Sequence, residues 1–516
     1  MAPWLEYFLW GTLSLYITLP FGLAVLAYII ASLCSMKARS NKQVKGFGGP
    51  TSHWLKGNIN DITFDGHGLA FHIRCTERFK TAYRVWFGPL RSALVLCHPD
   101  TVKPVLSKNA PKERFFYKFL FPFLGDGLGL QEGAKWWNTR KLVTPAFHFD
   151  ILRRYVPIFQ ESAKILVEKW SQACGPSGRK VELFQDISLM TLDSVLKCAF
   201  SYSSNCQTEG RHDKYIKAIN GIAKALLDRL LNPFYHFDWL YRLTPARSKF
   251  MKYCDLIHQK SDEVIESRRL LQKSPCNGHH KRSYRDFLDI LLEAEDINGN
   301  GLNNENIRAE VNTFMFAGHD TVASALCWTL YCLAANEEHQ RICQKEIDEC
   351  FANKPSEDLD WDDINNMNYL SMCMKESMRL FSPVPVIGRT LDEEYVIDGK
   401  RVPEGTFVLV CIYAVHRNPH VWEKPQMFNP RRFETDTVEG RSAYAFIPFS
   451  GGPRNCMGKN FGQTEMKTSL ATILHKFDLS VDPEDLIHEE DDLFPELVLR
   501  SKNGVRINVK PRASCG

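Results

Sequence analysis

The loop around Cys456 places the strongest constraint on what this chain can fold into. Residues 449–458 read Phe-Ser-Gly-Gly-Pro-Arg-Asn-Cys-Met-Gly and lead directly into a run of helical character. Glycines permit the sharp turn and close backbone approach that such a loop needs. A cysteine thiolate can hold a heme iron from one side, and its electron donation favours cleavage of an O–O bond on the other side. We therefore predict that Cys456 is the axial ligand of a heme iron and that Arg454 contacts a heme carboxylate.

Five fixed positions of this loop resemble the heme-binding loop of the cytochrome P-450 monooxygenases. The pattern F-x-x-G-x-R-x-C-x-G is filled by Phe449, Gly452, Arg454, Cys456 and Gly458. A structural cysteine buried in a turn is the alternative; it suits most of the 16 cysteines of the chain but fits Cys456 poorly. The resemblance covers nearly the whole chain. It implies a mainly α fold with small β-sheets, a single large heme-thiolate domain, heme b as cofactor and dioxygen as oxidant.

The N-terminal region carries a long apolar run. No charged residue occurs in residues 7–36, and a helix of ~20 apolar residues is enough to span a bilayer. A cleaved signal peptide would have a shorter apolar region and a basic start, whereas Glu6 precedes this run. Under the positive-inside rule, the basic residues after the run place the rest of the chain in the cytoplasm; they are Lys37, Arg39, Lys42 and Lys45.

These observations divide the chain into three parts. We expect a membrane anchor at 1–36, a hinge with basic residues, glycine and proline at 37–60, and a catalytic domain at 61–516. The resemblance implies a single-pass protein of the endoplasmic reticulum membrane. Lys plus Arg number 64 against 60 Asp plus Glu, and this balance argues against a nucleic-acid binder, whose charge is usually more lopsided.

The body of the chain is predicted to be mainly helical, with strands near its two ends. Strand patterns at 83–87 and 93–97 flank Gly88-Pro89, a plausible hairpin, and further strand patterns lie within 394–409 and 497–509. A long amphipathic helix is expected at 246–272, and Asp100 and Asp186 are expected as helix N-caps. The glycine-rich stretch 125–133 lacks the spacing of a nucleotide-binding loop, so reducing equivalents must come from a partner.

An apolar helix is predicted around Gly318, Asp320 and Thr321. Its residues Phe314, Gly318, Thr321 and Ala325 share one face, which could lie over the heme. A mid-helix threonine can bond back to the carbonyl four residues earlier, here that of Ala317, and with Gly318 this is expected to open the helix locally. Thr321 and Asp320 are then natural proton-relay groups. The alternative is that they are polar residues buried in the helix without a chemical role. The stretch resembles the A-G-x-D-T element of the family.

Two further sets of side chains follow from the resemblance. Glu376 and Arg379 stand three residues apart on a helix, and Arg432 resembles their third partner; we assign all three to the fold around the heme. Two heme carboxylates cannot be buried unpaired. A clamp for them is predicted from Trp136, Arg140, Arg389 and Arg454, and a basic docking face for an acidic flavoprotein from Lys141, Lys459 and Lys467.

Residues 310–322 look most like the signature of family four, the fatty-acid ω-hydroxylase branch. Three positions depart from it, namely Asn312, Val322 and Ala317. Many members carry at the position of Ala317 a glutamate that forms an ester with the heme. Alanine cannot form that ester, so we predict noncovalent heme. An apolar pocket is expected from Phe115, Phe116, Phe119, Phe121, Phe123, residues 384–387 and Phe494.

The sequence thus indicates a membrane-anchored heme-thiolate monooxygenase that hydroxylates fatty acids or related lipids. The resemblance implies electrons from an NADPH-dependent flavoprotein reductase, with cytochrome b5 as a candidate second donor. One alternative is a heme-thiolate isomerase of lipid hydroperoxides, which needs neither oxygen nor reductase. Another is a non-enzymatic heme or lipid-binding sensor, which would close the sixth coordination position of the iron with a second side chain.

Overall fold

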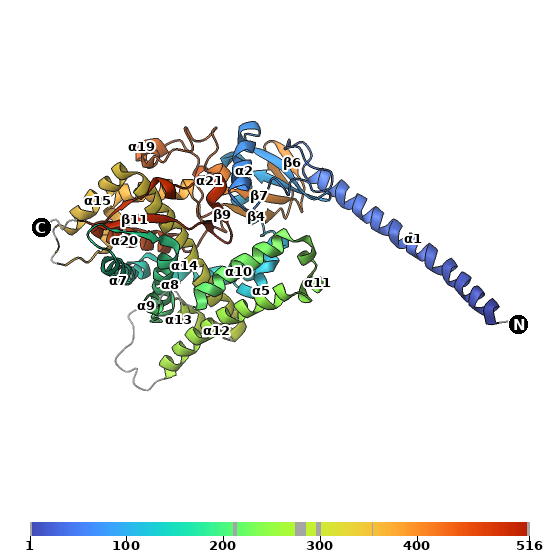
Figure 1. Ribbon diagram of the computed structural model, residues 1–516, viewed down its shortest axis with the longest axis horizontal. Coiled ribbons are helices and arrows are strands. Elements are labelled where there is room, and N and C mark those ends of the chain that lie inside the picture. Colours follow the sequence, from blue (N-terminus) through green and yellow to red (C-terminus); the bar gives the residue numbers. More distant parts are fainter. Residues whose placement is uncertain are drawn as a thin grey trace.

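The computed structural model describes residues 3–209, 214–273, 285–295, 301–352, 354 and 356–512. These form a mainly helical body from which one long helix, α1 (Pro3–Gln43), projects (Figure 1). Small sheets lie beside the base of α1 and at the opposite end of the body. The predicted mainly α fold with small β-sheets is therefore confirmed.

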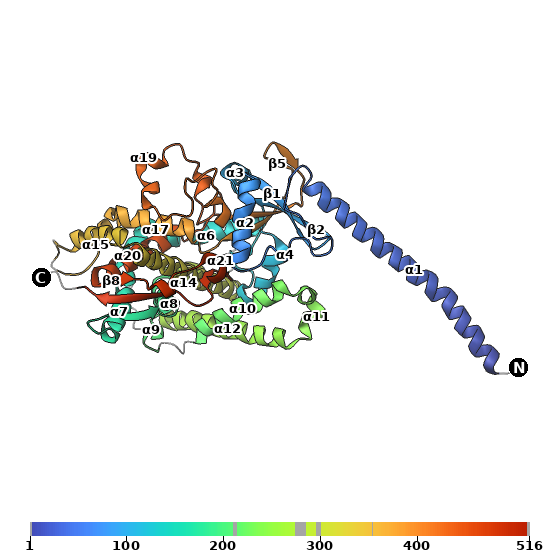
Figure 2. The ribbon, with the colours of Figure 1, turned by 45° about the horizontal axis from the view of Figure 1, so that its top comes forward.

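A buried helix, α14 (Asn304–Ala335), runs through the middle of the body (Figure 2). It begins where the Asn303 side chain accepts a hydrogen bond from the Asn306 backbone N–H at 2.8 Å, which satisfies one of the free donors of the first turn. Apolar residues occupy nearly all its sides, as expected for a helix enclosed by others. The helices packed on it include α8 (Leu183–Phe200), α17 (Asn368–Leu380) and α20 (Lys459–Lys476).

The remaining helices surround this centre. The longer ones are α2 (Gly66–Arg78), α3 (Pro99–Leu106), α6 (Gly133–Val143), α7 (Phe149–Ala173), α10 (Lys214–Leu231), α12 (Pro245–Lys273) and α15 (Glu337–Phe351). The short ones are α4 (Arg114–Tyr117), α5 (Phe121–Leu124), α9 (Cys206–Glu209), α11 (Asp238–Arg242), α13 (Phe287–Leu292), α16 (Trp361–Asn366), α18 (Ile412–Val415), α19 (Thr435–Val438) and α21 (Glu489–Asp492). The long helix predicted at 246–272 is confirmed as α12.

The largest sheet in the described part of the chain has four strands in the order β1 (Ala82–Phe87), β2 (Arg91–Leu96), β7 (Phe407–Cys411) and β4 (Val386–Thr390). Strands β1 and β2 form the predicted hairpin, and Gly88 in its turn has φ +69°, which suits glycine. Strand β2 runs parallel to β7, which brings residues 94–96 beside residues 408–410. The smaller sheets are β3 (Arg179–Glu182) with β11 (Arg506–Pro511) and β8 (Phe477–Ser480), β5 (Tyr395–Ile397) with β6 (Lys400–Val402), and β9 (Leu493–Pro495) with β10 (Leu499–Ser501).

The N-caps predicted at Asp100 and Asp186 are wrong. Helix α3 begins after His98, whose side chain accepts from the Asp100 backbone N–H at 3.3 Å, because Pro99 can occupy the first helical position. Helix α8 begins after Glu182, whose carboxylate accepts from two backbone N–H groups of the first turn. Both aspartates lie inside the first turn instead, where the positive end of the helix dipole also favours a negative charge.

The N-terminal helix does not end in a hinge. Helix α1 continues without a break to Gln43, so the basic residues after Met36 are helical. Gln43 donates to the Gly405 carbonyl at 2.8 Å, Ser40 donates to the Leu90 carbonyl at 2.5 Å, and Val44 and Phe47 are buried against the four-stranded sheet. We expected a hinge at 37–60, and this expectation is wrong for residues 37–47. The side chains of Ser40, Gln43, Val44 and Phe47 attach these residues to the body.

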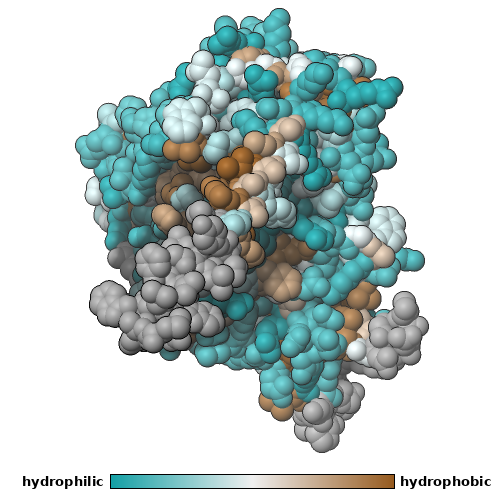
Figure 3. All heavy atoms as spheres, turned by 90° about the vertical axis from the view of Figure 1, so that its right-hand side faces the viewer, coloured by the Kyte–Doolittle hydropathy of each residue, from teal (hydrophilic) through white to brown (hydrophobic). Residues whose placement is uncertain are grey.

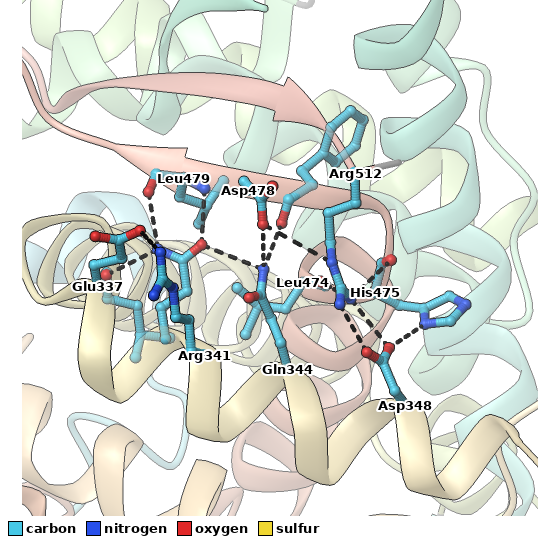
Figure 4. Close-up of polar contacts among 12 residues, drawn as sticks. Glu337, Arg341, Gln344, Asp348, Leu474, His475, Asp478, Leu479 and Arg512 are labelled. Atoms are coloured by element: carbon cyan, nitrogen blue, oxygen red, sulfur yellow. Dashed lines mark hydrogen bonds and ion pairs between the residues drawn. The ribbon is translucent and has the colours of Figure 1, made fainter. Parts of the chain in front are cut away.

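The C-terminal strand is fastened to α15 (Figure 4). Asp348 on α15 accepts from two nitrogen atoms of Arg512 at 2.7 and 3.0 Å and lies 2.9 Å from His475 Nδ1. Gln344, one turn earlier, donates to the Phe477 carbonyl at 3.1 Å and so ties α15 to β8. These contacts close the end of the body that lies away from α1 (Figure 1).

Candidate active site

Cys456 stands in a tight loop that leads into α20. Its backbone N–H donates to the Phe449 carbonyl at 2.9 Å and closes the loop. Gly452 has φ +68°, and a Cβ there would lie 1.7 Å from the Leu106 carbonyl oxygen, so glycine is required at this position. Although it lies deep in the body, the Cys456 side chain is accessible because it faces a cavity.

The surroundings of the Cys456 thiol act on its pKa in opposite directions. Burial raises the pKa, while the Gly458 backbone N–H and the positive charges of Arg140, Lys112 and Lys459 lower it. Gly458 is also the N-cap of α20, whose positive dipole end stabilises a thiolate. A bound metal ion would complete the deprotonation. The arrangement therefore suits a thiolate that serves as a metal ligand.

Helix α14 forms the opposite wall of the cavity. Its lining residues are Thr313, Phe314, Ala317, Gly318, Thr321, Val322 and Ala325. The Thr321 hydroxyl donates to the Ala317 carbonyl at 2.7 Å, which confirms the predicted back-bond. The helix is nevertheless continuous across Gly318, so the expected opening is wrong. A Cβ at Gly318 would lie 2.5 Å from Val195 Cγ2, which means that this glycine allows α8 and α14 to pack closely.

Asp320 points away from the cavity. It is buried, and Arg500 on β10 donates to its Oδ1 at 2.5 Å. Asp320 is also absent from the residues that line the cavity, whereas its neighbour Thr321 is among them. Sequence reasoning missed Arg500, since it lies 180 residues further along the chain and carries no motif.

Four cations gather at the side of the cavity. Arg140 donates to the Asn455 carbonyl at 2.9 Å and to its side-chain oxygen at 2.7 Å, and Arg454 donates to Asn109 at 2.7 Å. Lys112 lines the cavity, although no sequence pattern singled it out. Burial, Arg389 and Arg454 lower its pKa to about 7.

The four cations are Arg140, Arg454, Lys112 and Arg389. None of them forms an ion pair within the described ranges, and their hydrogen bonds go mainly to uncharged oxygens. Arg389 is buried behind the lining; its only hydrogen bond to the main chain, among the residues described, goes to the Gly388 carbonyl at 3.0 Å. Trp136 is buried in the lining with its ring 4.5 Å from the Arg454 guanidinium carbon. Unpaired buried charge is costly, so the cluster calls for an anion with more than one negative group.

Glu376, Arg379 and Arg432 form the predicted ion triad. Arg379 donates to the two Glu376 oxygens at 2.7 and 2.8 Å, and Arg432 Nε lies 3.3 Å from Glu376 Oε1. Glu376 and Arg379 are completely buried. Arg379 also donates to the carbonyls of Pro425 and Met427, so the triad holds the segment that precedes the Cys456 loop.

The phenylalanines at 115–123 do not line this cavity. Phe119 packs against Arg229 and His236, Phe123 packs against Phe316, and Phe121 is exposed. Phe119 and Phe123 belong instead to a core cluster with residues of α8, α10, α12 and α14. Phe116 packs beside Phe87 and Phe407 of the four-stranded sheet. Phe494 is also outside the lining, whereas Val384 and Ile387 belong to it as predicted.

The cavity fits a heme by its chemistry. It offers one sulfur ligand for iron, apolar walls for a macrocycle, and unpaired cations for two carboxylates. Cys456, Trp136, Arg140, Arg454 and Lys112 line it and could hold that group, with Arg389 behind them. A thiolate site with an apolar wall opposite and this helical fold define the heme-thiolate oxygenases as the class of protein.

Comparison with known proteins identifies the family within that class. Residues 47–507 match the family model described as Cytochrome P450. Cytochrome P450 4F2 of Homo sapiens is 40% identical over 471 residues, which cover 90% of this chain and 89% of that protein. Leukotriene-B4 omega-hydroxylase 3 of Mus musculus is 39% identical over 483 residues, which cover 92% of this chain and 91% of that protein. The chain belongs to the cytochrome P450 family and is a monooxygenase.

Proposed function

We propose that this protein hydroxylates fatty acids or related lipids with dioxygen and with electrons that a flavoprotein reductase takes from NADPH. The observation that carries the proposal is the cavity itself, which has the Cys456 sulfur on one wall and the apolar face of α14 on the other. The relatives support the lipid substrate, since one of them is named as a leukotriene omega-hydroxylase. Heme, when bound, supplies the iron at which dioxygen is activated for insertion into a C–H bond.

The side chains of the chain have separate tasks in this reaction. Cys456 would bind the iron, and Arg140, Arg454 and Lys112 would bind the heme carboxylates, with Arg389 adding positive charge behind them. Thr321 presents a hydroxyl to the oxygen side while its back-bond to Ala317 fixes the rotamer of the side chain. We propose that Asp320 takes part with Thr321 in the path that delivers protons, and its contact with Arg500 fixes the position of its carboxylate. Gly318 brings α8 close to α14 at this point.

The lining supports an apolar substrate. Near the Thr321 face it contains Val195, Ala199, Phe314, Val322, Ala325, Val384 and Ile387. No carboxylate side chain is found among the residues that line the cavity in the described part of the chain. Walls of this kind exclude water and hold hydrocarbon, which leaves one C–H bond of a chain near the reacting centre.

A hollow on the Cys456 side supports docking of an acidic redox partner. Lys141 and Lys459 line it together with the exposed Trp137. Lys467 was also predicted to belong to this face, but it points inward and donates to the Ile364 carbonyl at 2.9 Å. We propose that an NADPH-dependent reductase, with cytochrome b5 as a second donor, contacts this hollow.

The apolar surface supports a membrane location. Helix α1 is long and apolar enough to cross a membrane, because an 18-residue stretch within Pro20–Gln43 has a mean hydropathy of 1.8. Figure 3 views the molecule from the side of α1, and apolar side chains gather there. Helix α11 also lies on this side (Figure 1), and Phe237, Trp239 and Leu243 in and beside it are exposed. We propose a single-pass protein of the endoplasmic reticulum with its body in the cytoplasm.

Heme is proposed to be held without a covalent bond to α14. Ala317 faces the cavity and has no group that can form an ester. Acid and organic solvent should therefore extract all the heme from the denatured protein, and chromatography with mass spectrometry should find no heme-modified peptide of α14. An Ala317→Glu variant provides the comparison, since its carboxyl group restores the missing reactant. Heme retained by the natural protein would contradict this proposal.

The proposed reaction is tested with a panel of lipids, purified protein, reductase and NADPH, with products identified by mass spectrometry. Hydroxylated fatty acids or related lipids should form only with NADPH and should carry oxygen from labelled dioxygen. In Thr321→Ala the product formed per NADPH should fall at least about tenfold, because a positioned proton donor contributes ~10²–10⁴-fold. Thr329→Ala is the matched control, since Thr329 makes the same back-bond at 2.7 Å but lies outside the cavity. Lipid products that form equally well without NADPH would indicate an isomerase instead.

A further inference from the structure

The glycine segment, residues 125–132, lies flat against one turn of α14. A Cβ at Gly127 would lie 2.4 Å from Thr313 Oγ1 and 2.6 Å from the Ala309 carbonyl oxygen. A Cβ at Gly125 would lie 2.9 Å from the Ala309 side chain. Only glycine allows this approach, so these residues serve to place the backbone of the segment on the turn formed by residues 309–313.

Glu310 fastens the glycine segment to that turn. Its two carboxylate oxygens accept from the Leu128 backbone N–H at 2.9 and 3.0 Å, and Oε1 also accepts from Gln131 Nε2 at 3.2 Å. Glu310 is buried, and the nearby Asp126 and Lys135 pair with each other. Burial raises the pKa of Glu310 to about 7, so the carboxylate is kept in a place that disfavours its charge.

The other side of the glycine segment faces the cavity, and its carbonyl groups accept hydrogen bonds from two of the cations there. Lys112 Nζ donates to the Gly129 carbonyl at 2.5 Å, and Arg454 Nη1 donates to the Gln131 carbonyl at 3.2 Å. Leu128 and Gly129 themselves line the cavity. Both cations therefore donate to the backbone that Glu310 holds, and Arg454 is fixed by Asn109 as well. Arg140 does not share this dependence, because its hydrogen bonds go to Asn455.

We propose that Glu310 is a positioning residue for the cofactor: through the glycine segment it fixes Lys112 and Arg454 where they bind the heme carboxylates. The inference rests on the proposed heme-binding role of this cavity. Glu310 touches neither the cofactor nor the substrate in this scheme. Its contribution is to hold two donors in place before the cofactor binds, which reduces the cost of ordering them.

The test measures the rate at which heme leaves the ferric holoprotein for excess apomyoglobin. Glu310→Ala should speed heme loss about 10–100-fold, as expected when a residue that orients a ligand is removed. Glu310→Gln should give an intermediate rate, because its amide oxygen still accepts from Leu128. Glu305→Ala on the exposed first turn of α14 should leave the rate unchanged. Hydrogen exchange of the Leu128 amide should accelerate in Glu310→Ala and remain slow in the control.

A pair of double-variant cycles separates positioning from a general loss of stability. Glu310→Ala and Arg454→Ala should be strongly non-additive in heme loss, since Glu310 acts through Arg454. Glu310→Ala and Arg140→Ala should be additive, because Arg140 is held independently. Additive effects in both cycles, or a natural rate of heme loss in Glu310→Ala, would overturn the inference. A natural protein without a thiolate-bound heme would instead overturn the proposed function on which it rests.

Discussion

Replacing Cys456 with serine should abolish the red-shifted absorption of the reduced carbon monoxide complex and all lipid hydroxylation. A serine hydroxyl stays neutral near pH 7, so it gives the iron no strong ligand and no electron donation of the thiolate kind. The nearby N–H group of Gly458 and the cations that stabilise a thiolate cannot deprotonate an alcohol. We expect the largest effect on activity from this substitution.

Absorption spectra and product analysis check this expectation. Cys174→Ser is a matched control, since Cys174 is half-buried and its thiol contacts the Val509 carbonyl far from the cavity. The control should keep the red-shifted band and its activity. An unchanged spectrum in Cys456→Ser would show that another residue holds the iron.

The largest effect on stability should come from Arg379→Ala. It leaves the Glu376 carboxylate in a fully buried position with only Arg432 and a backbone N–H as partners. Removing one member of a buried ion pair costs about 3–5 kcal/mol, a large part of the stability of most proteins. It also removes the donors to the carbonyls of residues 425 and 427. We expect little or no heme-loaded protein after purification.

The yield of holoprotein and the midpoint of thermal unfolding measure this effect. Arg431→Ala is the control, because Arg431 and Glu434 form an exposed pair beside the triad. Exposed pairs contribute only about 0–1 kcal/mol, so the control should unfold close to the natural protein. Equal midpoints for the two variants would refute a structural role for the triad.

The features that sequence predicted best depend on local geometry. The turn at Cys456 follows from its glycines, and the back-bond of Thr321 follows from helix periodicity, so both could be placed without a fold. The pairing of Glu376 with Arg379 is local as well. Arg432 was placed only because its motif resembles a known third partner, since no local rule joins residues 56 positions apart.

The features that sequence missed depend on contacts across the fold. Neighbouring residues of a helix point about 100° apart, so Asp320 could not share the direction of Thr321, and Arg500 reaches it from a distant strand. Lys112 joins the cations only because its chain bridges to Arg389. The phenylalanines at 115–123 were expected at the cavity on hydrophobicity alone, which does not reveal the face that each helix turns inward.

The firm attachment of α1 also determines how the enzyme meets other proteins. Contacts of Gln43, Ser40 and the buried Val44 prevent α1 from rotating relative to the body. With α1 in a bilayer, the body diffuses laterally and rotates about the membrane normal, but the hollow near Lys459 stays at a constant tilt and height. A reductase confined to the same surface then searches fewer orientations for each encounter, and lost orientation is a main reason why protein association is slower than diffusion.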